Sequence, residues 1–474
     1  MALAYADAVT FVQNLAPTWV KPQHAMLAYI LCALAERPSL CSTEVARGLP
    51  DGPHARIEQS LHGRLKRLNR FLANPRLDEA EIFLRCYRLA VHFSADVPDA
   101  PQLLPILLDT TYFQPFAALI ASIPCGGRGL PIVFTTYHRR KLQACFPPVE
   151  RWPDPEATLG RPARRKHQPL RAACAEVHPW ASQNHIEEQL LNYLWSFVNS
   201  TQHIVIVADR GFARASLFRW FLNQERRFVI RFDGDTWLHL QDGRMGATKQ
   251  VVVLRPGEHC WIPHALYGQE DRVPVAVLAI WDVGQKEPWY LATNLDNDRT
   301  TETCYRWRMR IEAGNRDDKT GVILRQGGDQ HKLTSVLHLH RLLLAVLCLH
   351  WLAALTGLQA HHDLAEPHAV APELEHVPPD HPDFDLLDHG PAQPPPAIPH
   401  RGPPLRLPPW MRRFAVRGSL SYVRLGMEVL RDKHLAALVR RTVRWLGLYL
   451  WTLTPIWLPR HLRYRRKHWW PVPY

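Results

Sequence analysis

An uninterrupted run of β-branched and apolar residues from Ile204 to Ala208 constrains the fold of this chain most strongly. A strand that packs on one face alternates apolar and polar residues, whereas this run does not alternate and is typical of a strand buried on both faces. The sequence therefore predicts an α/β fold. Asp209 follows the run directly and stands at the carboxyl end of the strand, where ligands bind in open α/β sheets.

A second apolar run has the same character. Leu104 to Leu108 is apolar throughout, is interrupted by Pro105, and is followed by Asp109. We expect a second strand here, with Asp109 at its end. A single Asp after a strand is more often a turn or cap residue than a metal ligand.

Four polar side chains share one face of a predicted helix that includes residues 304 to 319. At about 100° per residue they occupy an arc of about 60° around the axis. They are Tyr305, Arg308, Glu312 and Lys319. The apolar residues that would hold this helix on a core, such as Cys304 and Trp307, fall on a different side of it. Gly314 and Gly321 weaken the helix by about 1 kcal/mol each, so we expect a kink or an end before Val322.

The three carboxylates Asp109, Asp209 and Glu312 suit a hard divalent cation. Mg²⁺ prefers oxygen ligands and shares its coordination with water and substrate phosphates. Two such ions clamp the attacking and leaving oxygens of a phosphodiester displacement. Arg308 and Lys319, beside Glu312, would then hold phosphates. A lone Glu and Arg four residues apart usually form a surface ion pair, but the combination with both Asp residues favours a catalytic site.

These residues resemble a known family. The spacing Tyr305-x2-Arg308-x3-Glu312-x6-Lys319, with Asp-Arg-Gly-Phe at 209–212 and Asp-Thr-Thr at 109–111, resembles bacterial insertion-sequence transposases of the DDE class. The likeness is to the insertion-sequence-four-like group, which carries the Tyr-Arg-Glu-Lys signature, and it covers roughly residues 100 to 350. It implies a ribonuclease-H-like core with a β-rich insertion, dependence on Mg²⁺ with Mn²⁺ as a substitute, and cut-and-paste transposition.

The resemblance also implies a role for each site residue. Asp109, Asp209 and Glu312 would bind the metal ions, and Tyr305, Arg308 and Lys319 would contact phosphates near the transposon end. Relatives make a hairpin intermediate, and a Trp of their insertion stacks with a base flipped from the DNA end. Trp289 is the best match for that residue. A buried Trp in a strand is the alternative, and the two interpretations have equal weight.

The partner implied by the resemblance is double-stranded DNA, both the terminal inverted repeats of the transposon and the target. Synapsis of two ends implies a homodimer on DNA. Two alternatives remain open: a domesticated DNA-binding protein without catalysis, and a ribonuclease-H-like nuclease without strand transfer. The complete set of carboxylates disfavours the first, and only the reaction products distinguish the second. Terminal-repeat sequence, target preference and the activity of this copy do not follow from the sequence.

Charge points to a polyanionic partner as well. The chain of 474 residues carries a formal charge of +13, and residues 410–474 hold fourteen Lys or Arg against two acidic residues. Nearly the whole excess therefore lies in this segment. Its Trp and Arg residues would stack on bases and contact phosphates, or lie on an acidic membrane surface.

Cysteine content and hydropathy bound the location of the protein. Nine cysteines form no Cys-x-x-Cys pair and favour a reducing compartment. The amino terminus has no basic region followed by an apolar core and cleavage site. Leu342 to Leu358 is at the lower limit for a membrane span, and we interpret it as a core helix. We expect a cytoplasmic, nucleoid-associated protein without an integral membrane span.

Composition divides the chain into six segments. The first is a helical module that is a candidate helix-turn-helix-like DNA reader, because apolar residues recur at helical spacing from Ile57 to Leu72 between basic residues. The fifth holds fourteen prolines and few large apolar residues, as an extended linker does. The predicted segments are the helical module 1–95, the first part of the core 96–232, the β-rich insertion 233–295, the second part of the core 296–360, the linker 361–409 and the basic tail 410–474.

Overall fold

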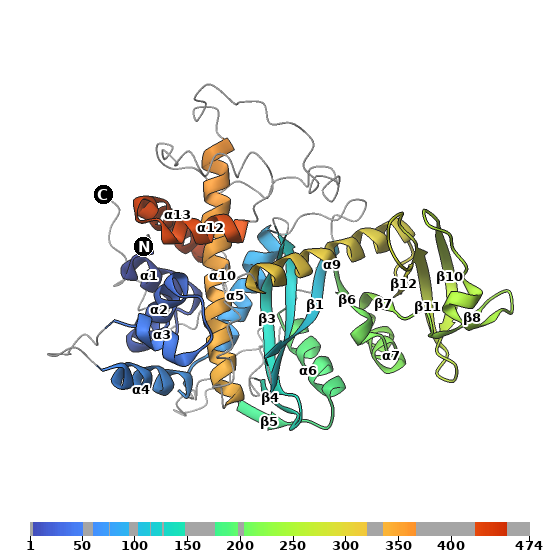
Figure 1. Cartoon of the computed structure of the whole chain (residues 1–474), viewed down its shortest axis with the longest axis horizontal. Helices are drawn as coiled ribbons and strands as arrows, with labels where there is room; N and C mark the ends of the chain where they lie inside the picture. The colour runs from blue at the N-terminus through green and yellow to red at the C-terminus, as the bar shows by residue number, and fades with distance from the viewer. Residues whose placement is uncertain are drawn as a thin grey trace, which may run out of the picture.

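The computed structural model describes most of the chain, in ten stretches. They are residues 3–50, 60–74, 76–93, 103–113, 115–125, 128–146, 176–197, 203–319, 335–365 and 422–452. Helices and one large mixed sheet make up this part, so the expectation of an α/β protein is confirmed. Figure 1 shows a helical layer at one end of the molecule and the sheet running away from it.

Twelve strands form the sheet, in the order β5-β4-β3-β2-β1-β6-β7-β12-β11-β10-β8-β9. The first seven are β1 (Leu103–Phe113), β2 (Phe116–Cys125), β3 (Arg128–His138), β4 (Gln143–Phe146), β5 (Glu176–Pro179), β6 (His203–Ala208) and β7 (Arg227–Phe232). The other five are β8 (Trp237–Leu240), β9 (Met245–Ala247), β10 (His259–Tyr267), β11 (Val273–Ile280) and β12 (Trp289–Thr293).

The centre of the sheet joins an antiparallel meander to two parallel strands. β1, β2 and β3 follow one another antiparallel, and β6 then pairs parallel with β1, and β7 parallel with β6. The predicted strand from Ile204 to Ala208 is confirmed as β6, whose residues beyond His203 are all buried. It is buried on both faces because α6 (Gln183–Trp195) and α7 (Ala215–Asn223) lie on one side and α9 (Asp298–Lys319) on the other.

Residues 233–295 extend this sheet. The segment holds β8 to β12 and the short helix α8 (Thr248–Val251), and β12 pairs antiparallel with β7, which attaches the added strands to the centre. The family resemblance implied a β-rich insertion here. In the structure these residues add strands to the edge of the same sheet (Figure 1).

A helical layer packs beside β3. It combines helices from both ends of the chain, which lie together around one long helix. The helices are α1 (Tyr5–Leu15), α2 (Lys21–Glu36), α3 (Ser42–Gly48), α4 (Leu61–Leu72), α5 (Glu79–Phe93), α10 (Val336–Ala365), α12 (Tyr422–Arg431) and α13 (Ala436–Thr452).

The long helix α10 is the centre of this layer. Its stretch Val336–His361 is long and apolar enough to cross a membrane by length and composition, and the apolar window is wholly buried inside the molecule. Helix α12 crosses it at two glycines, where a Cβ on Gly426 would overlap the carbonyl of Ala353 and one on Gly357 would overlap that of Tyr422. Glycine is required at this crossing because only its missing side chain allows the two backbones to approach.

The carboxyl-terminal helices belong to the same layer as the amino terminus. The amide of Leu3 donates to the carbonyl of Leu430, and the side-chain amide of Asn14 donates to the carbonyl of Val443. Residues 422–452, which composition placed in a basic tail, thus complete the layer that α1 and α2 begin. Residues 453–474 and nearly all of the predicted linker lie outside the described residues.

A buried ionic cluster ties the helical layer to the sheet. Glu79 of α5 is hydrogen-bonded to His340 at 2.6 Å and forms an ion pair with Nε of Arg341 at 2.7 Å, and all three side chains are about 1% exposed or less. His340 also contacts the hydroxyl of Thr136 on β3 at 3.1 Å. His340 therefore connects three elements, since it contacts Glu79 of α5 and Thr136 of β3 from its place on α10.

Candidate functional site

Asp109 and Asp209 lie side by side. The parallel pairing of β1 with β6 places Leu108 opposite Ala208, so each Asp is the next residue on one of two neighbouring strands. Neighbouring strands are about 4.8 Å apart, which brings the two carboxylates to one point of the sheet. The sequence suggested both residues independently, and the fold unites them.

Both carboxylates face α9. Side chains alternate along a strand, so Asp109 shares a face with Leu107, and Asp209 follows Val207 on the corresponding face of β6. Leu107 and Val207 pack in one cluster with Tyr305 of α9. The helix contacts β7, β6, β1, β2 and β3, and so passes over the carboxylate pair (Figure 1).

Arg308 connects the helix to the carboxylates. Its Nη2 lies 2.8 Å from Oδ2 of Asp209, with the Arg side chain 8% exposed and the Asp side chain 34% exposed. The other oxygen of Asp209 accepts from the amide of Arg210 at 2.7 Å, as an N-cap of the short helix η2 (Arg210–Phe212). A buried guanidinium and a cap hydrogen bond fix the orientation of this carboxylate.

Two details of the sequence interpretation were wrong. Asp109 does not end its strand: β1 continues to Phe113, because its residues beyond Leu108 pair with β2 in the hairpin, Asp109 opposite Ile120. The polar face of α9 is also not separate from its packing face, since Tyr305 and Arg308 are buried like Trp307. The predicted helix itself is confirmed as α9.

Trp289 and Tyr305 pack against each other. Their rings meet edge to face with centroids 5.2 Å apart, and Trp289 is 9% exposed while Tyr305 is 1% exposed. Burial raises the pKa of the Tyr305 hydroxyl to about 12, and Arg308 is the chief influence in the opposite direction. In this structure Trp289 therefore occupies a core position, which favours the packing role among the two alternatives for it.

Charged residues that the sequence did not single out surround this aromatic pair. Arg306 makes two 2.9 Å hydrogen bonds to Asp282 and stacks 5.6 Å from the Trp289 ring centroid. Arg231 of β7 bonds to Glu287 at 2.7 Å. Both ion pairs join the loop between β11 and β12 to the site. Residue spacing in the sequence did not indicate these two ion pairs, because their partners are 24 and 56 positions apart.

Glu312 and Lys319 are on α9, but their side chains lie outside the described residues. Glu312 comes one turn after Arg308, and the course of the helix from β6 toward β1 carries that turn in the direction of Asp109. Among the side chains that the structure describes, no group of three or more His, Cys, Asp or Glu is arranged to hold a metal ion. The described pair alone suits Mg²⁺, which binds to proteins through one or two carboxylates together with substrate phosphates.

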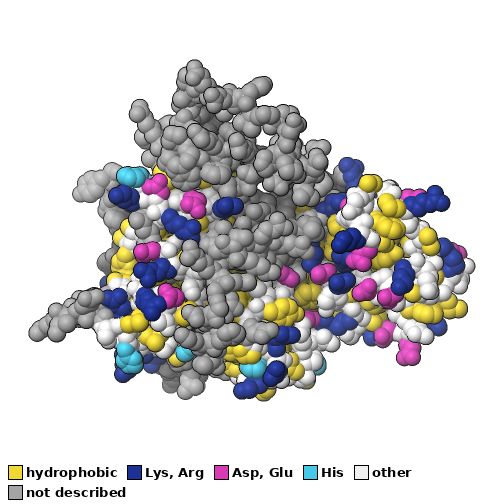
Figure 2. All heavy atoms as spheres, viewed as in Figure 1, with side chains coloured by type: hydrophobic (Ala, Val, Ile, Leu, Met, Phe, Trp, Pro, Cys, Tyr) yellow, Lys and Arg dark blue, Asp and Glu magenta, His cyan; other side chains and the backbone are white. Residues whose placement is uncertain are grey.

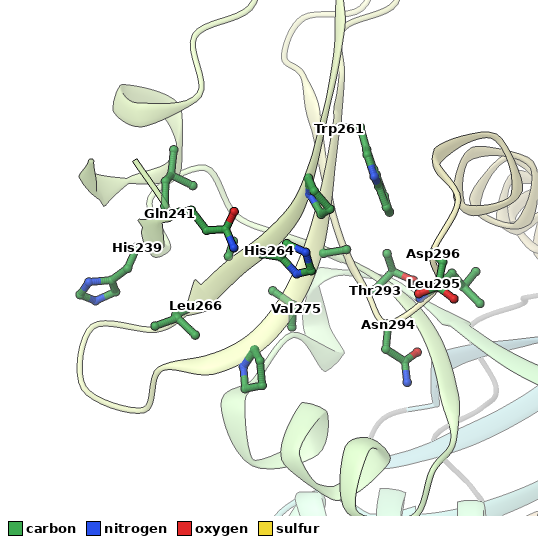
Figure 3. Close-up of a pocket in the computed structure, with 15 residues that line it drawn as sticks. His239, Gln241, Trp261, His264, Leu266, Val275, Thr293, Asn294, Leu295 and Asp296 are labelled. Atoms are coloured by element: carbon green, nitrogen blue, oxygen red, sulfur yellow. Dashed lines mark hydrogen bonds between the residues drawn. The ribbon is translucent and has the colours of Figure 1, made fainter. Parts of the chain in front are cut away.

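A separate concavity lies on the outer strands. It has a volume of about 540 Å³ and is lined from β8, β10, β11 and the segment after β12, with neither Asp109 nor Asp209 among its residues. Figure 3 shows Trp261, His264 and Gln241 around it, with Asn294 and Asp296 on the opposite side. Asp296 is the one carboxylate among its lining residues, which also include His239 and His264.

Comparison with known proteins gives no match, either to a family model or to a curated protein. The eight cysteines that the structure describes are all free thiols. The residues of the site are therefore the basis for assigning its chemistry.

Proposed function

We propose that this protein is a DNA transposase that cleaves transposon ends and joins them to target DNA with the help of divalent metal ions. The observation that carries the proposal is the juxtaposition of Asp109 and Asp209 on neighbouring parallel strands, beneath the helix that bears Arg308 and Glu312. Two carboxylates from distant segments at one point of the sheet suit phosphodiester chemistry better than a structural role, because like charges at this distance destabilise a fold unless a cation joins them.

The sheet supports a ribonuclease-H-like core. The order β3-β2-β1-β6-β7, with β2 antiparallel to β1 and with β3, β6 and β7 parallel to it, agrees with the core that the family resemblance implies. In open sheets of this kind ligands bind beyond the carboxyl ends of parallel strands. Asp209 lies at the end of β6, and Asp109 lies beside it where β1 passes that end.

Asp109, Asp209 and Glu312 would hold the ions. Bound Mg²⁺ would supply a nucleophilic water and neutralise charge on the attacking and leaving oxygens. Arg308 orients the carboxylate of Asp209 when no ion is bound, because its guanidinium lies 2.8 Å from that carboxylate. Lys319 would contact a phosphate from the same helix, as the signature spacing suggests.

DNA is the substrate that best fits the charge of the chain. The formal charge is +13, and a polyanion such as a duplex binds to a basic protein by releasing counterions. Two transposon ends must be held together for joining, so the proposal includes a homodimer on DNA. Strand transfer distinguishes it from a nuclease, and cleavage distinguishes it from a repressor.

The test uses the purified full-length chain and a labelled linear duplex that carries the DNA flanking its gene. Asp209→Asn and Asp109→Asn should abolish Mg²⁺-dependent cleavage and leave binding of the duplex nearly unchanged, because most affinity comes from phosphate contacts. Asp271→Asn is the matched control: this Asp pairs with Arg219 on the surface, more than half exposed. Cleavage by Asp209→Asn at the wild-type rate would refute the assignment.

The products decide between the remaining alternatives. Joined strand-transfer products support the transposase, whereas cleavage without joining identifies a nuclease. If the wild-type protein binds the duplex and never cuts it in Mg²⁺ or Mn²⁺, the chain is a DNA-binding protein that retains the site without its activity.

A further inference from the structure

The turn between β3 and β4 carries three consecutive cations. Arg139, Arg140 and Lys141 are all exposed, and within the described part of the chain none of them forms an ion pair. Exposed cations on globular proteins commonly pair with nearby acids, and no acid of the described stretches pairs with this cluster. Three positive charges without an ion-pair partner among the described residues therefore lie next to one another in this turn.

This turn is held in a fixed shape. The amide of Leu142 donates to the carbonyl of His138 at 2.8 Å, and the imidazole Nδ1 of His138 accepts from the amides of Arg140 and Lys141 at 3.2 Å. The amide of Arg139 also donates to the carbonyl of Pro115, in the turn between β1 and β2. Two neighbouring turns are thus joined at one edge of the sheet, and the cations are presented by an ordered backbone.

An exposed aromatic ring accompanies the cations. Tyr112 is 53% exposed, and the guanidinium carbon of Arg139 lies 4.7 Å from its ring centroid. This cation–π contact holds the Arg139 side chain without neutralising it. Tyr112 lies on β1 three residues after Asp109, so the cluster and the proposed site share one strand, with the two side chains on opposite faces of the sheet.

Register gives the distance between them. Asp109 is level with Ile120 of β2 and, through it, with Phe134 of β3, so Arg139 lies two strands across and five residues further along. With about 3.3 Å per residue and about 4.8 Å per strand, the separation is roughly 20 Å. The turn projects from the same edge of the sheet toward which the strands carrying both Asp residues run (Figure 1). In Figure 2, Lys, Arg and His side chains gather at the lower margin of the molecule, where Figure 1 places β4 and β5.

We infer that Arg139, Arg140 and Lys141 form a phosphate-contacting surface for duplex DNA, on one side of the bond that the carboxylates act on. The inference rests on the proposed function and adds to it the side of the cleaved bond on which the protein contacts the duplex. One base pair advances a duplex by about 3.4 Å, so roughly 20 Å corresponds to about six base pairs between the reacting phosphodiester and these cations. The contacts go to the backbone, and they are independent of base sequence.

The experiment measures the salt dependence of duplex binding by Arg139→Gln/Arg140→Gln/Lys141→Gln. Each phosphate contact contributes about 0.9 to the slope of log affinity against log salt, so the slope should fall by about 2 to 3. The matched control is Arg219→Gln/Arg244→Gln/Lys249→Gln, which removes the same charge from side chains that are each paired with an Asp in the structure. The control should leave the slope within 1 of the wild-type value.

Duplex length provides the second measurement. Two sets of otherwise identical duplexes extend either three or twelve base pairs beyond the cleaved bond, with the short arm placed on each side in turn. On one side the triple variant should match the wild type with the short arm and bind more weakly with the long arm. Arg140→Gln/Lys141→Gln, which keeps the contact of Arg139 with Tyr112, tests the same effect with the smallest change to the fold.

The outcomes separate this inference from the proposed function. An unchanged slope in both variants, or an equal loss in the control, overturns the phosphate surface while the transposase proposal stands. A loss that is the same for short and long arms also overturns it. If the wild-type protein binds no duplex at all, the proposed function fails first and this inference with it.

Discussion

The guanidinium of Arg308 lies 2.8 Å from the carboxylate of Asp209, although 99 positions separate the two residues in the chain. This ion pair is the contact by which α9 is aligned on the end of β6. It places the turn of the helix that contains Glu312 on the side of the sheet to which Asp109 and Asp209 point. One contact therefore governs both the packing of the helix and the assembly of the site.

Arg308→Gln tests this double role. Removal of the guanidinium should cost about 1–3 kcal/mol of unfolding free energy, because a largely buried charged hydrogen bond is lost and Asp209 keeps an unpaired charge. Cleavage should fall much further than that loss explains, since α9 no longer holds its position over the carboxylates. Chemical denaturation and single-turnover cleavage check the two effects.

Arg306→Gln is the control for the same helix. Arg306 bonds to Asp282 and Glu302, and it touches neither carboxylate of the site. We expect a loss of unfolding free energy of similar size with cleavage within a few-fold of wild type. Equal cleavage defects in the two variants would show that Arg308 acts through helix stability alone.

Trp289→Ala should destabilise the protein by about 3–5 kcal/mol, as loss of a large buried aromatic side chain does. The reason is its position: it is buried, contacts the Tyr305 ring, and lies under Arg306. Trp289→Phe should restore most of the stability and the activity by refilling the space. A Trp289→Ala protein that melts like wild type but fails only at a hairpin step would favour the base-stacking role instead.

Glu79→Gln should remove about 3–5 kcal/mol of unfolding free energy at neutral pH, because the change leaves Arg341 and His340 buried without their anion. Burial by itself would raise the pKa of Glu79, but Arg341 and then His340 outweigh it and hold the pKa below its ordinary value.

That shift fixes the sign of a pH effect. A carboxyl group with a lowered pKa in the folded state stabilises the fold above its unfolded pKa and loses that contribution as pH falls through the folded pKa. The wild-type protein should therefore lose stability on acidification below about pH 4. Glu79→Gln should have a flatter dependence over the same range. Denaturation midpoints at several pH values measure both curves, and parallel curves would contradict the prediction.

Local patterns predicted those parts of the fold that depend on local sequence. The apolar run before Asp209 specified β6, and the four-residue spacing specified α9, because strand burial and helical periodicity are both visible within a short window. The extension of β1 beyond Asp109 was not predictable in this way. It depends on β2, whose pairing with β1 is a tertiary choice.

Two further features could not be predicted from the sequence, for physical reasons. A helical wheel gives the angle between Tyr305 and Trp307, but not how much of the helix the sheet covers, and here it covers both. In residues 410–474 the excess of Arg concealed an apolar face, on which Val423, Met427 and Leu430 of α12 are buried against its neighbours. Composition averages over a segment, whereas packing depends on which side of the helix each residue occupies.

The hydrogen bond between Leu3 and Leu430 joins two segments that are synthesised far apart in time. Chains are synthesised from the amino terminus at about 5–20 residues per second, so α1 leaves the ribosome roughly 20 to 90 seconds before α13. During that interval Phe11, Val12 and Leu15, which are fully buried in the finished fold, lack part of their cover. The first helix of this protein therefore packs on α2 first and gains its remaining cover only after residues 436–452 have been synthesised.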